Sequence, residues 1–110
     1  MLKADKLHHL PSERKKMQLF TTLEPCMMCL GAAMSFFIGE IYYALEEPID
    51  GAVDFAVRFW RENQREIPSY SLPAIHDGLL KSESQDLLRE YINIVPDGPL
   101  VEFSRTLIAL

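Results

Sequence analysis

The chain has 110 residues, with 11 lysines and arginines against 16 aspartates and glutamates, and a formal net charge of −5. That length suits one small domain, and a composition of 48% hydrophobic and 25% charged residues excludes a disordered or low-complexity chain. The acidic balance argues against a broad phosphate-binding surface, and the longest uncharged stretch, residues 25–39, is too short to cross a bilayer.

Apolar runs and helical patterns follow one another along the chain. Pro11 ends the first helical pattern, Pro25 suits a first helical position, Asp50 can cap a helix, and Ser82 with Gln85 has the spacing of a capping box. In chain order the patterns predict the end of a helix at 1–10, a charged loop at 12–16, a strand at 17–23, a helix at 25–39, a strand at 40–45, a helix after residue 50, a loop at 63–71, a short edge strand at 71–75, a helix after residue 82 and a last helix after residue 98.

Strands that alternate with helices predict an α/β fold with helices packed on a sheet. Only two or three strands are available, so we expect an incomplete sheet within a single, partial domain over residues 1–110. Helical spacing also predicts which side chains fill the core, namely Met27, Met28, Met34, Phe36, Phe37, Trp60, Leu87, Leu88, Tyr91 and Ile92. Three arginines that share one helical face are expected to be solvated, namely Arg58, Arg61 and Arg65.

The most informative segment is the run TTLEPCMMC at residues 21–29. Cys26 and Cys29 are three residues apart at the start of a predicted helix, so their side chains point the same way. The positive end of the helix dipole and unpaired backbone N–H groups lower the pKa of thiols placed there. Such a pair suits either zinc binding or redox chemistry, and two buried structural thiols are the third interpretation.

The longer run TLEPCMMCLGAAMSFFIGEIYYAL resembles the second zinc motif of the cytidine/deoxycytidylate deaminase superfamily, whose signature is H-x-E followed downstream by P-C-x-x-C. The run is closest to the branch of tRNA adenosine deaminases and guanine deaminases. The resemblance implies a three-layer cytidine-deaminase-like sandwich, here incomplete. It also implies that Cys26 and Cys29 bind Zn²⁺ and that Glu24 and Pro25 shape the turn next to the substrate.

Family members complete the zinc site with a histidine and use the glutamate of H-x-E as the acid–base group. This chain has no H-x-E: its three histidines, His8, His9 and His76, are followed two places later by leucine, proline and glycine. We therefore expect the first motif to lie before Met1, in a chain that is truncated at its amino terminus, and we assign no catalytic residue. As written, the chain is expected to be inactive.

Two other functions stay open. One is a non-catalytic pseudo-deaminase that acts as a subunit or zinc-binding scaffold, and the other is a thiol-redox module built on the C-x-x-C pair. The acidic balance favours a small nucleobase or nucleoside over tRNA as the substrate. Apolar faces left uncovered in a partial domain predict a homo-oligomer. Two cysteines without an apolar leader indicate a cytoplasmic protein with no membrane contact.

Overall fold

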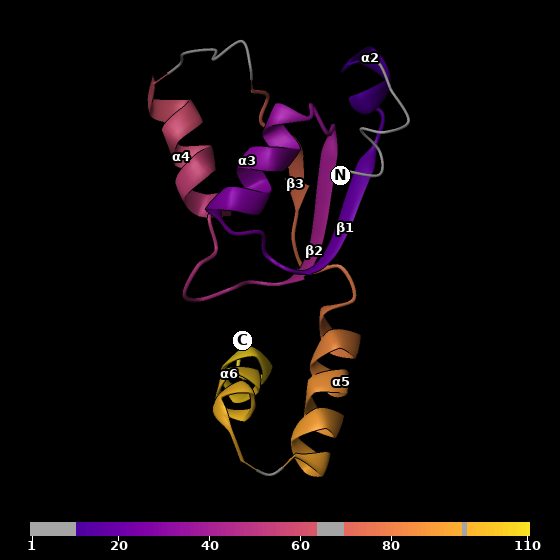
Figure 1. Ribbon diagram of the computed structural model, residues 1–110, viewed down its shortest axis with the longest axis vertical. Coiled ribbons are helices and arrows are strands. Elements are labelled where there is room, and N and C mark those ends of the chain that lie inside the picture. Colours follow the sequence, from indigo (N-terminus) through magenta and orange to yellow (C-terminus); the bar gives the residue numbers. More distant parts are fainter. Residues whose placement is uncertain (1–10, 64–69, 96) are drawn as a thin grey trace.

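The computed structural model describes residues 11–63, 70–95 and 97–110 (Figure 1). The elements are α2 (Pro11–Arg14), β1 (Gln18–Leu23), α3 (Met27–Ser35), β2 (Glu40–Leu45), α4 (Val53–Asn63), β3 (Ala74–His76), α5 (Lys81–Ile94) and α6 (Pro99–Ile108). The α/β class expected from the sequence is confirmed. The predicted helix at 1–10, with His8 and His9, lies outside the described residues.

The strands form one parallel sheet in the order β1-β2-β3. Phe20 lies beside Tyr42, and Tyr42 lies beside His76. Parallel neighbours are joined by right-handed crossovers, and the strand order advances in one direction, so α3 and α4 lie on the same face of the sheet (Figure 1). This places both helices over the side chains of alternate residues of β2.

The main core lies between that face and the two helices. Ile41 of β2 is fully buried and is surrounded by apolar side chains from α3, from α4 and from the segments next to them. The buried members of this cluster are Leu30, Ala33, Met34, Phe36, Ile38, Ile41, Ala52 and Ala56. Trp60 packs against the cluster while remaining partly exposed. Burial on one face explains why α3 and α4 hold their positions beside the sheet.

The opposite face of the sheet carries a row of three stacked rings. The centroids of Phe20 and Tyr42 are 4.9 Å apart, and those of Tyr42 and His76 are 4.5 Å apart. The phenol of Tyr42 donates to the carboxylate of Glu40 at 2.6 Å, and Nε2 of His76 lies 3.2 Å from the same carboxylate. Phe20 is still 59% exposed. Among the described residues, no helix therefore covers the Phe20 end of this row.

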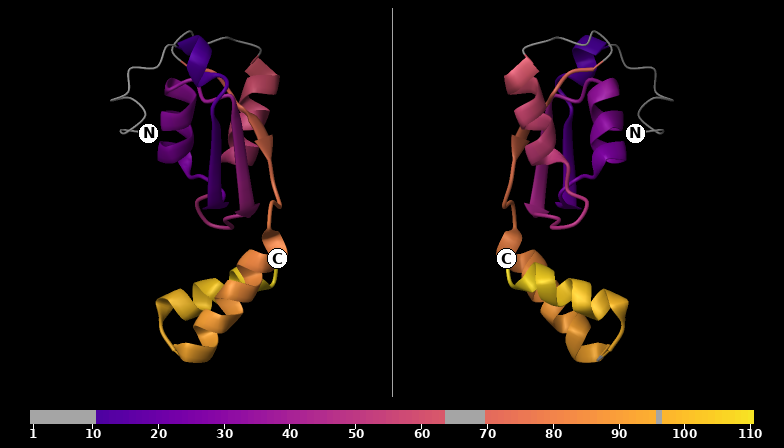
Figure 2. Two further views of the ribbon diagram at one scale, coloured as in Figure 1. Left: turned by 90° about the vertical axis from the view of Figure 1, so that its right-hand side faces the viewer. Right: turned by 90° about the vertical axis from the view of Figure 1, so that its left-hand side faces the viewer.

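Helices α5 and α6 form a hairpin beyond the carboxyl ends of β1 and β2 (Figures 1 and 2). A second apolar cluster joins them to the sheet: Ala44, Leu45 and Leu107 are buried, with Leu23, Leu88 and Phe103 packed against them. The radius of gyration is 16.0 Å, against about 13 Å expected for a compact domain of this length. The sheet with its two helices and the hairpin thus make an elongated molecule.

Several local predictions are wrong. A charged loop was expected at 12–16, whereas Pro11–Arg14 form a short helix, and α3 begins at Met27, two residues after Pro25. Ser82 lies inside α5, whose cap position is Leu80, so no capping box forms. Met27 and Met28 were expected in the core and are 61% and 79% exposed.

The hairpin also departs from the predicted core. Leu87 was expected to be buried and is 67% exposed, because it lines the open pocket between the hairpin and the ends of β1 and β2. None of the side chains described in α5 is fully buried. No described helix is long and apolar enough to cross a bilayer.

Candidate metal centre at the start of helix α3

The two cysteines lie where the chain leaves β1 and enters α3. The N–H of Glu24 donates to the carbonyl of Leu45 at 2.8 Å, which extends the strand pairing by one residue. Cys26 then has an extended backbone (φ −76°, ψ 176°) at the cap position, and its carbonyl accepts the N–H of Leu30 at 2.9 Å. Cys29 is the third residue of the helix. The sequence therefore places one thiol at the mouth of the helix and the other in its first turn.

The pKa values of the two thiols are shifted in opposite directions. The backbone N–H of Cys29 lowers the pKa of the Cys26 thiol, as do the Cys29 side chain and the N–H of Met28, although the Cys26 side chain forms no capping hydrogen bond. The pKa of Cys29 is raised, first because its thiol donates to the Cys26 sulfur and then by the charge of that sulfur. Both thiols are free, Cys26 partly buried and Cys29 exposed. The sulfurs thus face each other and solvent can reach them.

Glu24 connects the cysteine turn, residues 24–26, to the loop before α4 through its carboxylate. Its Oε1 accepts the N–H of Glu47 at 3.4 Å and its Oε2 accepts the N–H of Val53 at 3.0 Å. Pro25 is buried and its carbonyl accepts the N–H of Ala52 at 3.1 Å. These contacts hold Glu24 and Pro25 in the turn. That either residue contacts the substrate stays a prediction.

The remaining candidate zinc ligands are the three histidines, of which only His76 is among the described residues. His76 lies on the ring-bearing face of the sheet, beside Tyr42, whereas α3 packs on the other face. His8 and His9 lie outside the described residues. Over residues 11–63, 70–95 and 97–110, no three histidine, cysteine, aspartate or glutamate side chains are grouped so that they could hold a metal ion. The structure therefore brings together two of the residues that a metal site needs.

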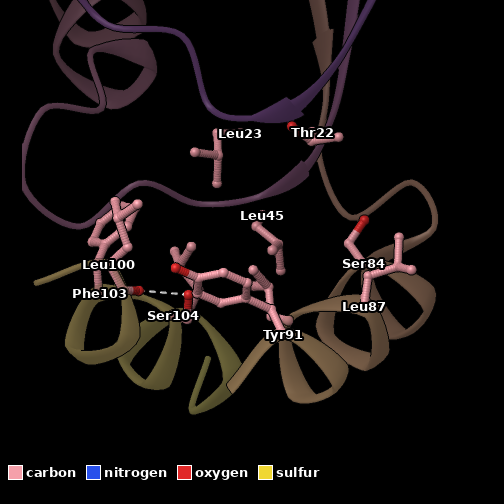
Figure 3. A pocket seen from close by; sticks show the side chains of 11 residues that line it. Thr22, Leu23, Leu45, Ser84, Leu87, Tyr91, Leu100, Phe103 and Ser104 are labelled. Atoms are coloured by element: carbon pink, nitrogen blue, oxygen red, sulfur yellow. Dashed lines mark hydrogen bonds between the residues drawn. The ribbon is translucent and has the colours of Figure 1, made fainter. Parts of the chain in front are cut away.

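Two apolar pockets lie away from the cysteines. One, of about 390 Å³, separates the ends of β1 and β2 from the hairpin (Figure 3). In that view Leu23 and Leu45 point from the sheet toward Tyr91 and Phe103 of the hairpin (Figure 3). The other, of about 250 Å³, lies between α3 and α4 and includes Met27. Neither pocket is lined by Cys26 or Cys29, so the thiol pair is a surface feature.

The chain is similar to curated proteins that share one name. It is 37% identical over 73 residues to a tRNA-specific adenosine deaminase of Agrobacterium fabrum, a match that covers 66% of this chain and 45% of the relative. It is 27% identical over 73 residues to a tRNA-specific adenosine deaminase of Rickettsia typhi, over 66% of this chain and 47% of the relative. No family model matches the chain.

A solved structure from a study of A-to-I editing by tRNA:A34 deaminases at the wobble position of transfer RNA is 38% identical to the chain, with a TM-score of 0.49 over 64% of this chain and 48% of that one. The chain spans about half the length of the curated relatives it matches.

Over the matched part of the chain, these relatives confirm the expected resemblance to the cytidine/deoxycytidylate deaminase superfamily. Within that superfamily, both relatives carry the name of tRNA-specific adenosine deaminases. The expectation of a small nucleobase or nucleoside in preference to tRNA is therefore wrong. It rested on net charge alone, and net charge does not determine which substrate a domain accepts.

The donor set allows a direct test of whether zinc suits this site. Zinc in a catalytic site takes three protein ligands, commonly thiolates and imidazoles, and keeps a fourth position open. Cys26 and Cys29 provide two thiols close together, and the pKa of Cys26 is lowered, which favours its thiolate. The described residues offer no third ligand. The pair therefore fits half of a zinc site.

Proposed function

We propose that residues 1–110 are part of one deaminase domain that acts on adenosine in tRNA and that they provide the cysteine half of its zinc site. The observation that carries the proposal is the pair of facing thiols at the start of α3, in a chain related to tRNA-specific adenosine deaminases. The two free thiols also suit the reducing cytoplasm, where we place the protein.

In this proposal, Cys26 and Cys29 hold the metal, and the fixed turn before them presents both thiols at one point. When bound by these thiols, zinc would supply the Lewis acidity with which the superfamily activates water for replacing the amino group of a base. The third ligand and the acid–base carboxylate come from an H-x-E motif, which these 110 residues do not contain. The chain by itself is therefore expected to release no ammonia from adenosine, cytidine or tRNA.

The test is a chimera in which the part of the Agrobacterium fabrum relative that precedes the matched segment is joined to this chain. The expected result is inosine in tRNA, detected by mass spectrometry of digested nucleosides, and none from free adenosine. The matched control is the same chimera with Cys26→Ser, which should form no inosine. A folded, zinc-loaded chimera that deaminates free nucleosides and leaves tRNA unchanged would contradict the proposed substrate, and one that deaminates neither would overturn the proposed activity.

A further inference from the structure

Glu24 contacts two segments next to the cysteines. It belongs to the cysteine turn at residues 24–26, and its side chain binds the loop at residues 47–53 that follows β2. Its backbone is held by the end of β2, through the hydrogen bond to Leu45. Its carboxylate accepts the N–H of Glu47 on one oxygen and the N–H of Val53 on the other. One side chain thus fixes the loop at two points that are six residues apart.

The backbone of the two segments is paired at the same place. The N–H of Ala52 donates to the carbonyl of Pro25 at 3.1 Å, and Cys26 forms an isolated antiparallel bridge with Gly51. The position of Cys26 is therefore determined by the loop at 47–53 as well as by α3. Because Val53 is the first residue of α4, the negative carboxylate also lies at the positive end of that helix.

Gly51 shows how close this contact is. A Cβ atom at this position would lie 2.6 Å from Cδ and Oε2 of Glu24 and 2.6 Å from the carbonyl oxygen of Glu47. No other amino acid fits there unless the carboxylate or the loop moves, so the absence of a side chain at Gly51 is what allows Glu24 to reach Val53.

We propose that Glu24 is a positioning residue for the metal centre: its carboxylate holds the loop at 47–53 against the cysteine turn, and this holds the Cys26 thiol where it can bind zinc together with Cys29. Glu24 touches neither thiol in this role and acts through the backbone of Pro25 and Ala52. The inference rests on the proposed zinc site and adds a residue to it that supplies no metal ligand.

The test compares Glu24→Gln with the wild-type chain. Glutamine has the same shape, but its amide nitrogen is a donor and would face one of the two backbone N–H groups, so one of the two contacts is lost. The dissociation constant for Zn²⁺ is measured by competition with a chromophoric chelator, at a temperature where circular dichroism shows both proteins folded. We expect zinc binding to weaken by about tenfold, the lower end of the range for residues that support metal ligands.

Three further variants separate positioning from a general effect on stability or charge. Glu46→Gln removes an exposed carboxylate from the neighbouring loop and should leave the zinc dissociation constant within about twofold of wild type. Gly51→Ala should weaken zinc binding as Glu24→Gln does, and the double variant should be no weaker than the worse single one, because both remove the same contact. Equal zinc affinity in folded wild-type and Glu24→Gln proteins would overturn the inference.

Amide hydrogen exchange provides a measurement without metal. In Glu24→Gln, the N–H groups of Ala52 and Val53 should exchange at least tenfold faster than in wild type, while that of Leu30, within α3, is unchanged. Unchanged exchange at Ala52 and Val53 would also overturn the inference. If the wild-type chain binds no zinc but exchange accelerates as expected, the zinc site fails, whereas the loop contact made by Glu24 stands.

Discussion

The side chain of Gln85 donates a hydrogen bond from Nε2 to the carbonyl of Leu107 at 3.2 Å, and the same nitrogen lies 3.2 Å from the carbonyl of Ile108. These carbonyls are in the last turn of α6, where a helix cannot satisfy all of its own acceptors. One amide in the first half of α5 thus closes the end of α6 and joins the two helices of the hairpin.

Replacing Gln85 by alanine should destabilise the hairpin. Two hydrogen bonds between neutral groups are lost, so we expect the free energy of unfolding to fall by about 1–2 kcal/mol in urea titration. Ser82→Ala is the matched control. Ser82 is exposed inside α5, so this change should alter the free energy of unfolding by less than about 0.5 kcal/mol, whereas loss of a capping box would cost more. A larger loss in Ser82→Ala than in Gln85→Ala would contradict the observed start of α5.

Phe20 and Ile41 lie on opposite faces of the sheet and should respond differently to truncation. Ile41 is fully buried, so Ile41→Ala should lower the free energy of unfolding by about 2–5 kcal/mol. Phe20→Ala should cost about 1 kcal/mol, because its ring is 59% exposed and its main contact is the stack on Tyr42. Urea unfolding of both variants measures this, and equal losses would indicate that Phe20 is covered in solution.

Tyr43 should make the chain less stable at alkaline pH. Burial, followed by the charge of Glu24, raises its pKa from 10.0 to about 12. Between these values the unfolded chain has lost the phenol proton while the folded chain keeps it, so the stability present below pH 10 is lost as the pH rises toward 12. Urea unfolding at about pH 8 and pH 11 should show a greater loss in wild type than in Tyr43→Phe, and the same loss in both would contradict this assignment.

The two cysteines should react in a fixed order with iodoacetamide. The pKa of Cys26 is lowered, chiefly by the backbone N–H of Cys29, and the pKa of Cys29 is raised by its contact with Cys26. As the pH increases, the thiolate therefore forms first at Cys26, and peptide mass spectrometry should find the first label there. Cys29→Ser replaces one of the groups that lower the pKa of Cys26, so Cys26 should then react more slowly at neutral pH. Preferential labelling of Cys29 at neutral pH would contradict this order.

Local patterns predicted most of the elements around the site. The strand at 40–45 was predicted with its observed bounds, and the strand at 17–23 differs by one residue, because strands with one buried face have a short apolar repeat that can be recognised in the sequence. The placement of Cys26 and Cys29 at the start of a helix also follows from local spacing.

The contacts that join the hairpin helices and those that hold the loop at 47–53 could not be predicted, because they connect segments that are distant in the sequence. Nothing near Gln85 in the sequence indicates that its amide meets the end of α6, 22 residues away. Likewise, the carboxylate of Glu24 reaches Val53, 29 residues later, through a space left by Gly51. The exposure of Met27 and Met28 could not be predicted either, because the helical repeat does not determine how wide a face of α3 its neighbours cover.

Zinc binding by Cys26 together with Cys29 is what the proposed function requires first. It is tested most directly by the metal content of the 110-residue chain after equilibration with zinc and removal of unbound metal, measured by mass spectrometry for wild type, Cys26→Ser and Cys29→Ser. We expect about one zinc ion per wild-type chain and essentially none in either variant. Zinc content that is the same in all three proteins, or is absent from the folded wild-type chain, would contradict the assignment.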